Sequence, residues 1–180
     1  MDIVSHALWA GAGAEVLGHK VPMDRKARWQ IVALAMAPDI VPLLPLIAWA
    51  LAGTAPLALV YSYIAATPGT EPLLPPVLTA FIHHLHCTMH SAIVVAGITI
   101  VAWVANRAFP LVLLGWWSHV ILDIPTHSAD YYKVSALYPF SDLGWDGIAW
   151  TEPGFLAVNY GLLAFVYLLL TRSRVLHLIK

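Results

Sequence analysis

Long apolar stretches alternate with short polar segments along the chain, and they predict a bundle of helices. The strongest run from Gln30 to Leu51, from about Val77 to Ala105, from Phe109 to Ile124 and from Phe155 to Leu170. Each is close to the roughly 20 residues that an α-helix needs to cross a bilayer. Ile3 to Leu17 predicts a fifth, weaker helix, either spanning or re-entrant. We therefore expect an all-α, polytopic membrane protein with four or five transmembrane helices.

Two other segments should lie outside the spans. Thr54 to Ala66 is apolar but short, which predicts an interfacial helix or a short helix at the outer end. Thr126 to Pro153 contains several aromatic residues and prolines, which predicts a loop with aromatic anchors. No linker rich in Gly or Ser divides the chain, so residues 1–180 should form a single integral membrane domain.

Composition supports a membrane protein and excludes several other classes. Hydrophobic residues make up 60% of the chain and charged residues 11%, whereas soluble domains have about 25% charged residues. The net charge of −1 comes without a long basic run, so the chain has no nucleic-acid-binding signature. Cys87 is the single cysteine, which excludes an internal disulfide and a thiolate-rich zinc site. Asp2 replaces the positive start of a signal peptide, so we expect the first helix to be retained.

Positive charges predict the orientation of the spans. Basic residues gather between Lys20 and Arg28, at Arg107, and from Arg172 to the C-terminus, and alternation of the spans puts all three positions on one side. The loop from Gly53 to Pro76 has no Lys or Arg, and the other long loop has one lysine. The positive-inside rule makes the basic side cytoplasmic. We expect an integral protein of a prokaryotic cytoplasmic (inner) membrane.

Five polar residues interrupt the apolar stretches. His119 and Asp123 are four apart and share one helical face, and His6, Asp39 and His90 each interrupt another stretch. A buried charge in lipid is costly, so such residues are functional candidates. At about 1.5 Å per residue, all five lie about 16 to 25 Å above the basic side. The shared depth predicts that they meet in one site.

Asp39 follows Pro38, which predicts that the helix breaks just before the aspartate. Such a break at depth is tolerated only where the backbone is buried in protein or lines a wet cavity. The alternative is that Asp39 acts as an N-cap that satisfies backbone donors.

Other histidines are weaker ligand candidates. His86 and His90 share a face, and His90 is the deeper of the two, whereas His83 and His84 should be solvated near the outer surface. His127 follows a proline that should disrupt the helix, so its spacing from the preceding aspartate predicts no shared face.

Histidine and carboxylate ligands without thiolate suit zinc, or manganese, iron or cobalt. Such an ion lowers the pKa of bound water to about 7, which makes a hydroxide that can hydrolyse esters without a serine or cysteine nucleophile. His6, His119 and Asp123 are therefore candidate catalytic residues. A metal-ion or proton transporter would use the same cluster. Haem ligation by His90 and His119 is a third alternative, in which the aspartates would have no clear role.

Several short motifs carry these ligands in order along the chain, namely Ser5-His6, Pro38-Asp39, Thr88-Met89-His90-Ser91, Gly115-Trp116-Trp117-Ser118-His119 and Leu122-Asp123. With the Tyr138-Pro139-Phe140 that follows, they resemble the family of inner-membrane metal-dependent hydrolases first noted as LexA-regulated in bacteria. That family often has Pro-Asp-x-Asp where this chain has Val41, so a second carboxylate is missing at that position.

The order of ligand types is also similar to that of zinc-dependent phospholipase C and the related single-strand-specific nucleases. This likeness implies that Asp39, His90, His119 and Asp123 hold one ion, while Asp123 bridges to a second ion held partly by His6. Ligands for a third metal are scarce, so the expectation is one or two ions. The implied activity is hydrolysis of a phosphoester that is lipid-borne or otherwise accessible from the membrane, with membrane lipids and a small-molecule or lipid substrate as partners.

Overall fold

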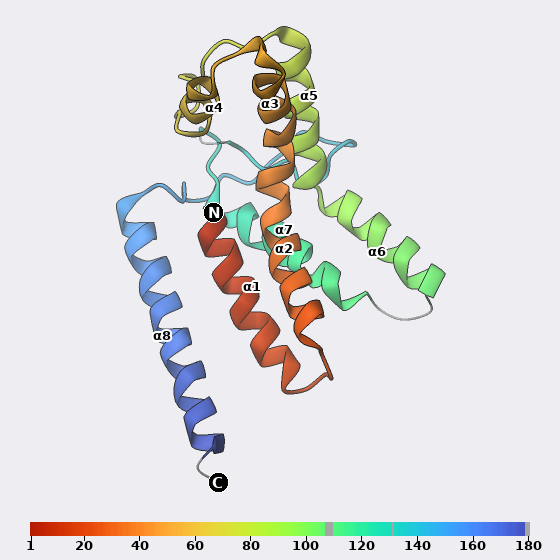
Figure 1. The fold of residues 1–180 in the computed structure, drawn as a ribbon, viewed down its shortest axis with the longest axis vertical. Coiled ribbons are helices and arrows are strands. Elements are labelled where there is room, and N and C mark those ends of the chain that lie inside the picture. Colours follow the sequence, from red (N-terminus) through yellow and green to blue (C-terminus); the bar gives the residue numbers. More distant parts are fainter. Residues whose placement is uncertain (107–109, 131, 179–180) are drawn as a thin grey trace.

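The computed structural model describes residues 1–106, 110–130 and 132–178, and its regular structure within these ranges is helical (Figure 1). The α-helices in chain order are α1 (Ile3–Gly18), α2 (Arg25–Ile40), α3 (Leu44–Trp49), α4 (Leu57–Ile64), α5 (Pro76–Met89), α6 (Ala92–Asn106), α7 (Leu114–Thr126) and α8 (Pro153–Leu178). Short turns of other helical types cover Val41–Leu43, Ala50–Thr54 and Leu111–Leu113. The prediction of an all-α fold is confirmed.

Fewer helices qualify as membrane spans than the sequence predicts. Within the described ranges, Arg25–Gly53 and Pro153–Ser173 are long and apolar enough to cross a membrane. The pair α5–α6 would be a third span if its two bent helices count as one, and Leu111–Thr126 is apolar but shorter. α1 has 16 residues, below the roughly 20 that a span needs. The structure thus supports two or three candidate spans where the sequence predicts four or five.

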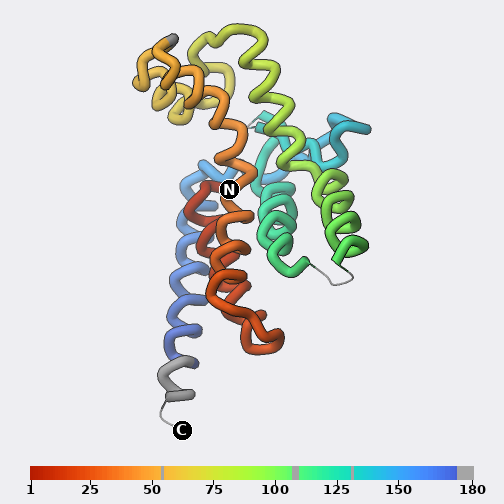
Figure 2. Tube along the Cα trace, turned by 45° about the vertical axis from the view of Figure 1, so that its right-hand side comes forward, coloured from red at the N-terminus to blue at the C-terminus, as the bar shows by residue number. Residues whose placement is uncertain are grey.

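Helices α1, α2 and α7 form the centre of the molecule, with α2 between the other two (Figures 1 and 2). Small side chains let α1 and α2 approach closely, since Ala10 and Ala14 pack directly against Ile31 and Ala35. α8 packs mainly against α1. Asn159 of α8 fixes this contact, because its amide donates to a serine hydroxyl of α1 and accepts from a tryptophan N–H of the same helix.

Helices α3, α4 and α5 extend beyond the end of α1 and enclose a separate small core (Figure 2). Leu46, Val60 and Ile82 are buried there. α4 is the short helix expected between Thr54 and Ala66, and residues 127–130 and 132–152 lie in the expected loop.

The break predicted just before Asp39 is wrong, and so is the N-cap alternative. α2 continues through Pro38 and Asp39 to Ile40, and the helix type changes only at the Val41–Leu43 turn. Pro38 lacks an N–H and removes one hydrogen bond, which a buried helix that packs on both sides tolerates. The second proline, Pro42, lies in the turn where the regular helix ends.

The apolar stretch from Val77 to Ala105 is not one helix, as the sequence predicts, but two. α5 and α6 meet at an angle of 61°, and His90 at the junction has φ −96° and ψ 9°. The Ser91 hydroxyl accepts from the N–H of Val94 at 3.2 Å and so caps the start of α6. The bend is therefore specified by a serine cap inside an otherwise apolar stretch.

The predicted orientation depends on where the basic segments lie. The turn between α1 and α2 and the C-terminal end of α8 lie towards the same end of the molecule (Figure 1). Arg107 is outside the described residues. The arrangement agrees with the alternation of spans, and which side of a membrane this end faces stays a prediction.

Candidate metal centre

Two ligand candidates come from α7, and a close contact with α2 positions them. His119 and Asp123 lie one turn apart on the buried face of α7. The Nδ1–H of His119 donates to the carbonyl oxygen of Ala35 at 2.7 Å. This hydrogen bond requires α7 to lie close to α2, which Gly115 permits. A Cβ at position 115 would lie 2.0 Å from the carbonyl oxygen of Ile31.

His90 enters the site from the bend between α5 and α6. Its Nδ1–H donates to the carbonyl oxygen of His86 at 2.8 Å, so its Nε2 faces α7. The Nε2 atoms of His90 and His119 are 3.1 Å apart. The indole N–H of Trp116 in α7 donates to the carbonyl of Met89 at 2.6 Å, which holds the bend against α7.

Asp39 approaches from the last turn of α2. Its Oδ1 lies 3.5 Å from Nε2 of His90 and 3.7 Å from Nε2 of His119. Its side chain is 21% exposed, whereas those of His90, His119 and Asp123 are at most 1% exposed. Asp39 therefore marks the open side of the site.

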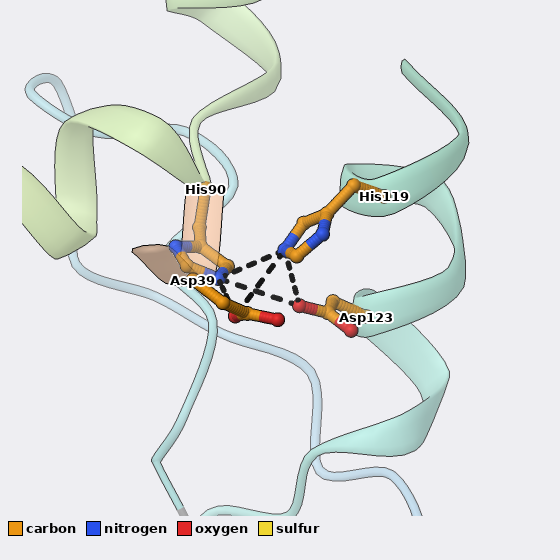
Figure 3. Close-up of side chains that lie close together, drawn as sticks. All are labelled: Asp39, His90, His119 and Asp123. Carbon is orange, nitrogen blue, oxygen red and sulfur yellow. Dashed lines mark hydrogen bonds and ion pairs between the residues drawn. The ribbon is translucent and has the colours of Figure 1, made fainter. Parts of the chain in front are cut away.

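Four of the predicted ligands converge, namely Asp39, His90, His119 and Asp123, with one ligand atom from each within 4.8 Å of all the others (Figure 3). They come from three separate segments of the chain. The group contains no thiolate, and three of its four members are buried.

The hydrogen bonds of the two histidines determine what the site can accept. Each Nδ1 faces a backbone carbonyl, which only accepts, so each Nδ1 carries a proton and each ring turns its Nε2 towards the site. Oδ2 of Asp123 lies 2.9 Å from Nε2 of His119. Without an ion, the two carboxylates repel each other, and protons held at the Nε2 atoms would offset this repulsion. A divalent ion would replace those protons and bind all four groups at once, so the residues fit a metal.

His6 lies beside this group and not in it. Its ring stacks on His119 with centroids 3.8 Å apart, and its Nε2 is 2.9 Å from Oδ1 of Asp123. The amine of Met1 contacts the same oxygen. The two oxygens of Asp123 thus face different partners, which is the arrangement that a carboxylate bridging two ions requires. The second ion stays a prediction.

The two weaker candidates are close by. The ring of His86 lies 4.0 Å from that of His90, and its Nε2 is buried without a hydrogen-bond partner among the described residues. His127 lies closer to Asp123 than predicted, because α7 continues through Pro125 to Thr126. Its Nδ1 is 3.1 Å from the carbonyl oxygen of Asp123 and 3.8 Å from Oδ1.

The helix survives Pro125 because it ends one residue later, so a single hydrogen bond is lost. Burial lowers the pKa of His127 to about 4, which keeps this imidazole neutral near pH 7. His83 and His84 are exposed, as predicted, and His84 hydrogen-bonds the hydroxyl group of Tyr138 at 2.9 Å.

Sequence reasoning missed the supporting residues. The sequence analysis names Gly115 and Trp116 only as part of a motif, yet the first permits the approach of α2 and the second holds the bend beside His90 against α7. The signal was present, since both precede His119 within one helical turn. No protein-family model, curated protein or solved structure matches the chain, so the functional argument rests on the geometry of this site.

Proposed function

We propose that the chain is a membrane-embedded, metal-dependent hydrolase of a phosphoester. The observation that carries the proposal is the convergence of two imidazole Nε2 atoms, whose rings are each oriented by a backbone carbonyl, with two carboxylates. Metal-bound histidines in proteins donate their other ring N–H in the same way. Because these hydrogen bonds already orient both rings towards the site, the geometry favours binding of an ion.

The donor set indicates the class of metal. Two imidazoles and two carboxylates suit zinc, with manganese, iron and cobalt as alternatives. We propose that Asp39, His90, His119 and Asp123 hold this ion, with a second one between Asp123 and His6. A divalent ion at such a site supplies Lewis-acid activation of a phosphoryl group and of water.

The chain's own residues would then position and shelter the reaction. Of the four proposed ligands, only Asp39 has a partly exposed side chain, so the other three would hold the ion away from bulk water. His6 lies against Oδ1 of Asp123, where its imidazole can hold a proton beside the site. The tight packing around the rings excludes bulk water, which strengthens electrostatic interactions with a developing charge.

Membrane embedding is supported by the surfaces of the helices. Exposed apolar side chains cover α8 and α6, including Phe165 and Leu168 of α8 and Val101 and Val104 of α6. Together with the two long apolar segments, these surfaces support an integral membrane protein. We propose that the membrane is a prokaryotic inner membrane, with the basic end cytoplasmic.

Metal analysis and a hydrolysis screen of the protein purified in detergent test the proposal. We expect about one or two bound divalent ions per chain, loss of metal in Asp123→Asn and His119→Gln, and metal-dependent hydrolysis of phosphomonoesters or phospholipids that both variants lack. Asp130→Asn, an exposed change, is the matched control. Metal binding without turnover, together with gradient-driven ion uptake in liposomes, would indicate a transporter. Hydrolysis that survives both substitutions would remove this site from the chemistry.

A further inference from the structure

Residues 127–130 and 132–152 belong to a loop that is hydrogen-bonded to the segments that carry the proposed metal ligands. At one end of the site, the N–H of Ala92 donates to the carbonyl of Ala136 at 2.8 Å, and the hydroxyl of Ser91 donates to that of Tyr138 at 2.6 Å. At the other end, the N–H groups of Gly147 and Ile148 donate to backbone carbonyls at the end of α7. The loop therefore holds a fixed position over the bend at His90 and the end of α7.

A cavity of about 310 Å³ lies between this loop and α5. His86 forms part of its wall, and the ring of His86 contacts the ring of His90. Lys133, Ser135 and Asp142 of the loop line the opposite side. The wall of the cavity thus includes charged and polar side chains, and one side chain, His86, separates it from the proposed ligand His90.

The backbone around the cavity is shaped to place Lys133. Tyr132 has φ +47°, a conformation rare for residues other than glycine, and its hydroxyl donates to Glu71 at 2.6 Å. Gly144 packs against the lysine side chain, since a Cβ there would lie 2.4 Å from Cγ of Lys133. Within the described residues Lys133 has no ion-pair partner, so its ammonium is available to an anion.

Apolar side chains of the same loop are exposed, and two of them lie within two residues of the cavity-lining aspartate in the chain. Phe140, Leu143, Trp145 and Ile148 are between 62% and 82% exposed, and we call these four the apolar rim. The loop joins the end of α7 to the start of α8 at Pro153, where a candidate span begins, and it contacts the start of α6. A segment over the ends of three apolar helices lies at a membrane surface if those helices are embedded.

Resting on the proposed hydrolase, we propose that a phosphate-bearing amphiphile enters this site from the lipid leaflet. Its phosphate binds at Lys133 in the cavity, and its hydrocarbon part lies along the apolar rim. A lipid matches both features at once, whereas a soluble phosphoester would leave the rim without a role. Asp142 lines the same cavity, and its negative charge repels the bound phosphate. This repulsion would disfavour head groups that carry several negative charges.

Binding to metal-free protein tests this proposal separately from catalysis. The protein in detergent is treated with a chelator, and its affinities for inorganic phosphate and for phosphatidic acid with six-carbon chains are measured by calorimetry. We expect the lipid to bind more tightly than phosphate. Lys133→Gln should weaken both ligands about tenfold. The double variant Phe140→Ser/Leu143→Ser should weaken the lipid about tenfold and leave phosphate unchanged.

Three further variants complete the design. Asp142→Asn should strengthen phosphate binding about threefold, because it removes the opposing charge. Lys20→Gln and Phe165→Ser are controls that make the same kinds of substitution at exposed positions elsewhere. Neither should change the affinity for phosphate or for the lipid. Equal affinity of the two ligands, an unchanged affinity in Lys133→Gln, or a rim variant that binds the lipid normally would each overturn the proposal. Absence of hydrolysis would overturn the proposed function and leave these binding results standing.

Discussion

Asp39 contributes to the site both with and without a metal ion. Without an ion, its Oδ1 lies within ion-pair distance of the Nε2 atoms of His90 and His119, and its Oδ2 is buried without a hydrogen-bond partner among the described residues. With an ion, the same carboxylate would be a ligand. One substitution should therefore weaken both states.

Asp39→Asn should lower the melting temperature of the chelator-treated protein, because an amide cannot balance the charge of a protonated imidazole beside it. The fall should be about 2–4 °C for each kcal/mol of lost interaction. The same variant should lose at least about 100-fold in metal affinity. Calorimetry with and without metal measures both effects, and Asp130→Asn should change neither. A higher melting temperature without metal would contradict an attraction between Asp39 and the two histidines.

The contact between α2 and α7 is where the fold and the metal centre depend on one residue. Gly115→Ala would drive a methyl group into the backbone of α2 at Ile31, and the helices would have to separate. We expect a loss of about 1–3 kcal/mol in the free energy of unfolding. The hydrogen bond from His119 to Ala35 would lengthen, so metal affinity should fall as well.

Gly97→Ala on α6 is the matched control, since nothing lies within 4 Å of its added methyl group. It should stabilise the protein by about 0.5–1 kcal/mol through helix propensity. Denaturant unfolding should therefore show a loss of stability in Gly115→Ala and a gain in Gly97→Ala. Metal titration should show weaker binding in Gly115→Ala. Equal stabilisation by both changes would show that α2 and α7 do not approach as closely as described.

The bend between α5 and α6 depends on a single hydroxyl. Ser91→Ala removes the cap on Val94 and the tie to the loop at Tyr138. The expected cost is about 1–2 kcal/mol. Hydrogen exchange should rise at the first turn of α6, whereas Ser173→Ala near the end of α8 should leave that turn protected. Unchanged exchange at Val94 would exclude the capping role.

At the scale of the molecule, a bound ion would join α2, α7 and the α5–α6 bend. Ligand binding stabilises a folded state by an amount that grows with the logarithm of the free ligand concentration, about 2.7 kcal/mol at a concentration 100 times the dissociation constant. Chelation should therefore lower the melting temperature, and added zinc should restore it. Asp123→Asn should abolish this response. A melting temperature that ignores both treatments would indicate that the cluster holds no structural ion.

Much of the architecture follows from the apolar pattern, and its exceptions have physical causes. The apolar stretches predicted the helices and placed the four converging ligands at a shared depth, because helical periodicity and rise are regular. The bend at His90 depends on one serine cap, and the continuity of α2 through Pro38 depends on neighbouring helices. Tertiary contacts of this kind leave no periodic signal. The role of Gly115 could not be predicted from the sequence for the same reason, since it depends on the contact with α2.

The spread of the ligands along the chain also sets the order in which the centre can be built during synthesis. Asp39 is made early, whereas His119 and Asp123 follow only after α5 and α6 have been made. At roughly 5–20 residues per second, the first carboxylate waits several seconds for its partners. Metal capture is therefore a late event in biogenesis, and a nascent chain that stops before α7 would carry an acidic side chain that no ion can yet neutralise.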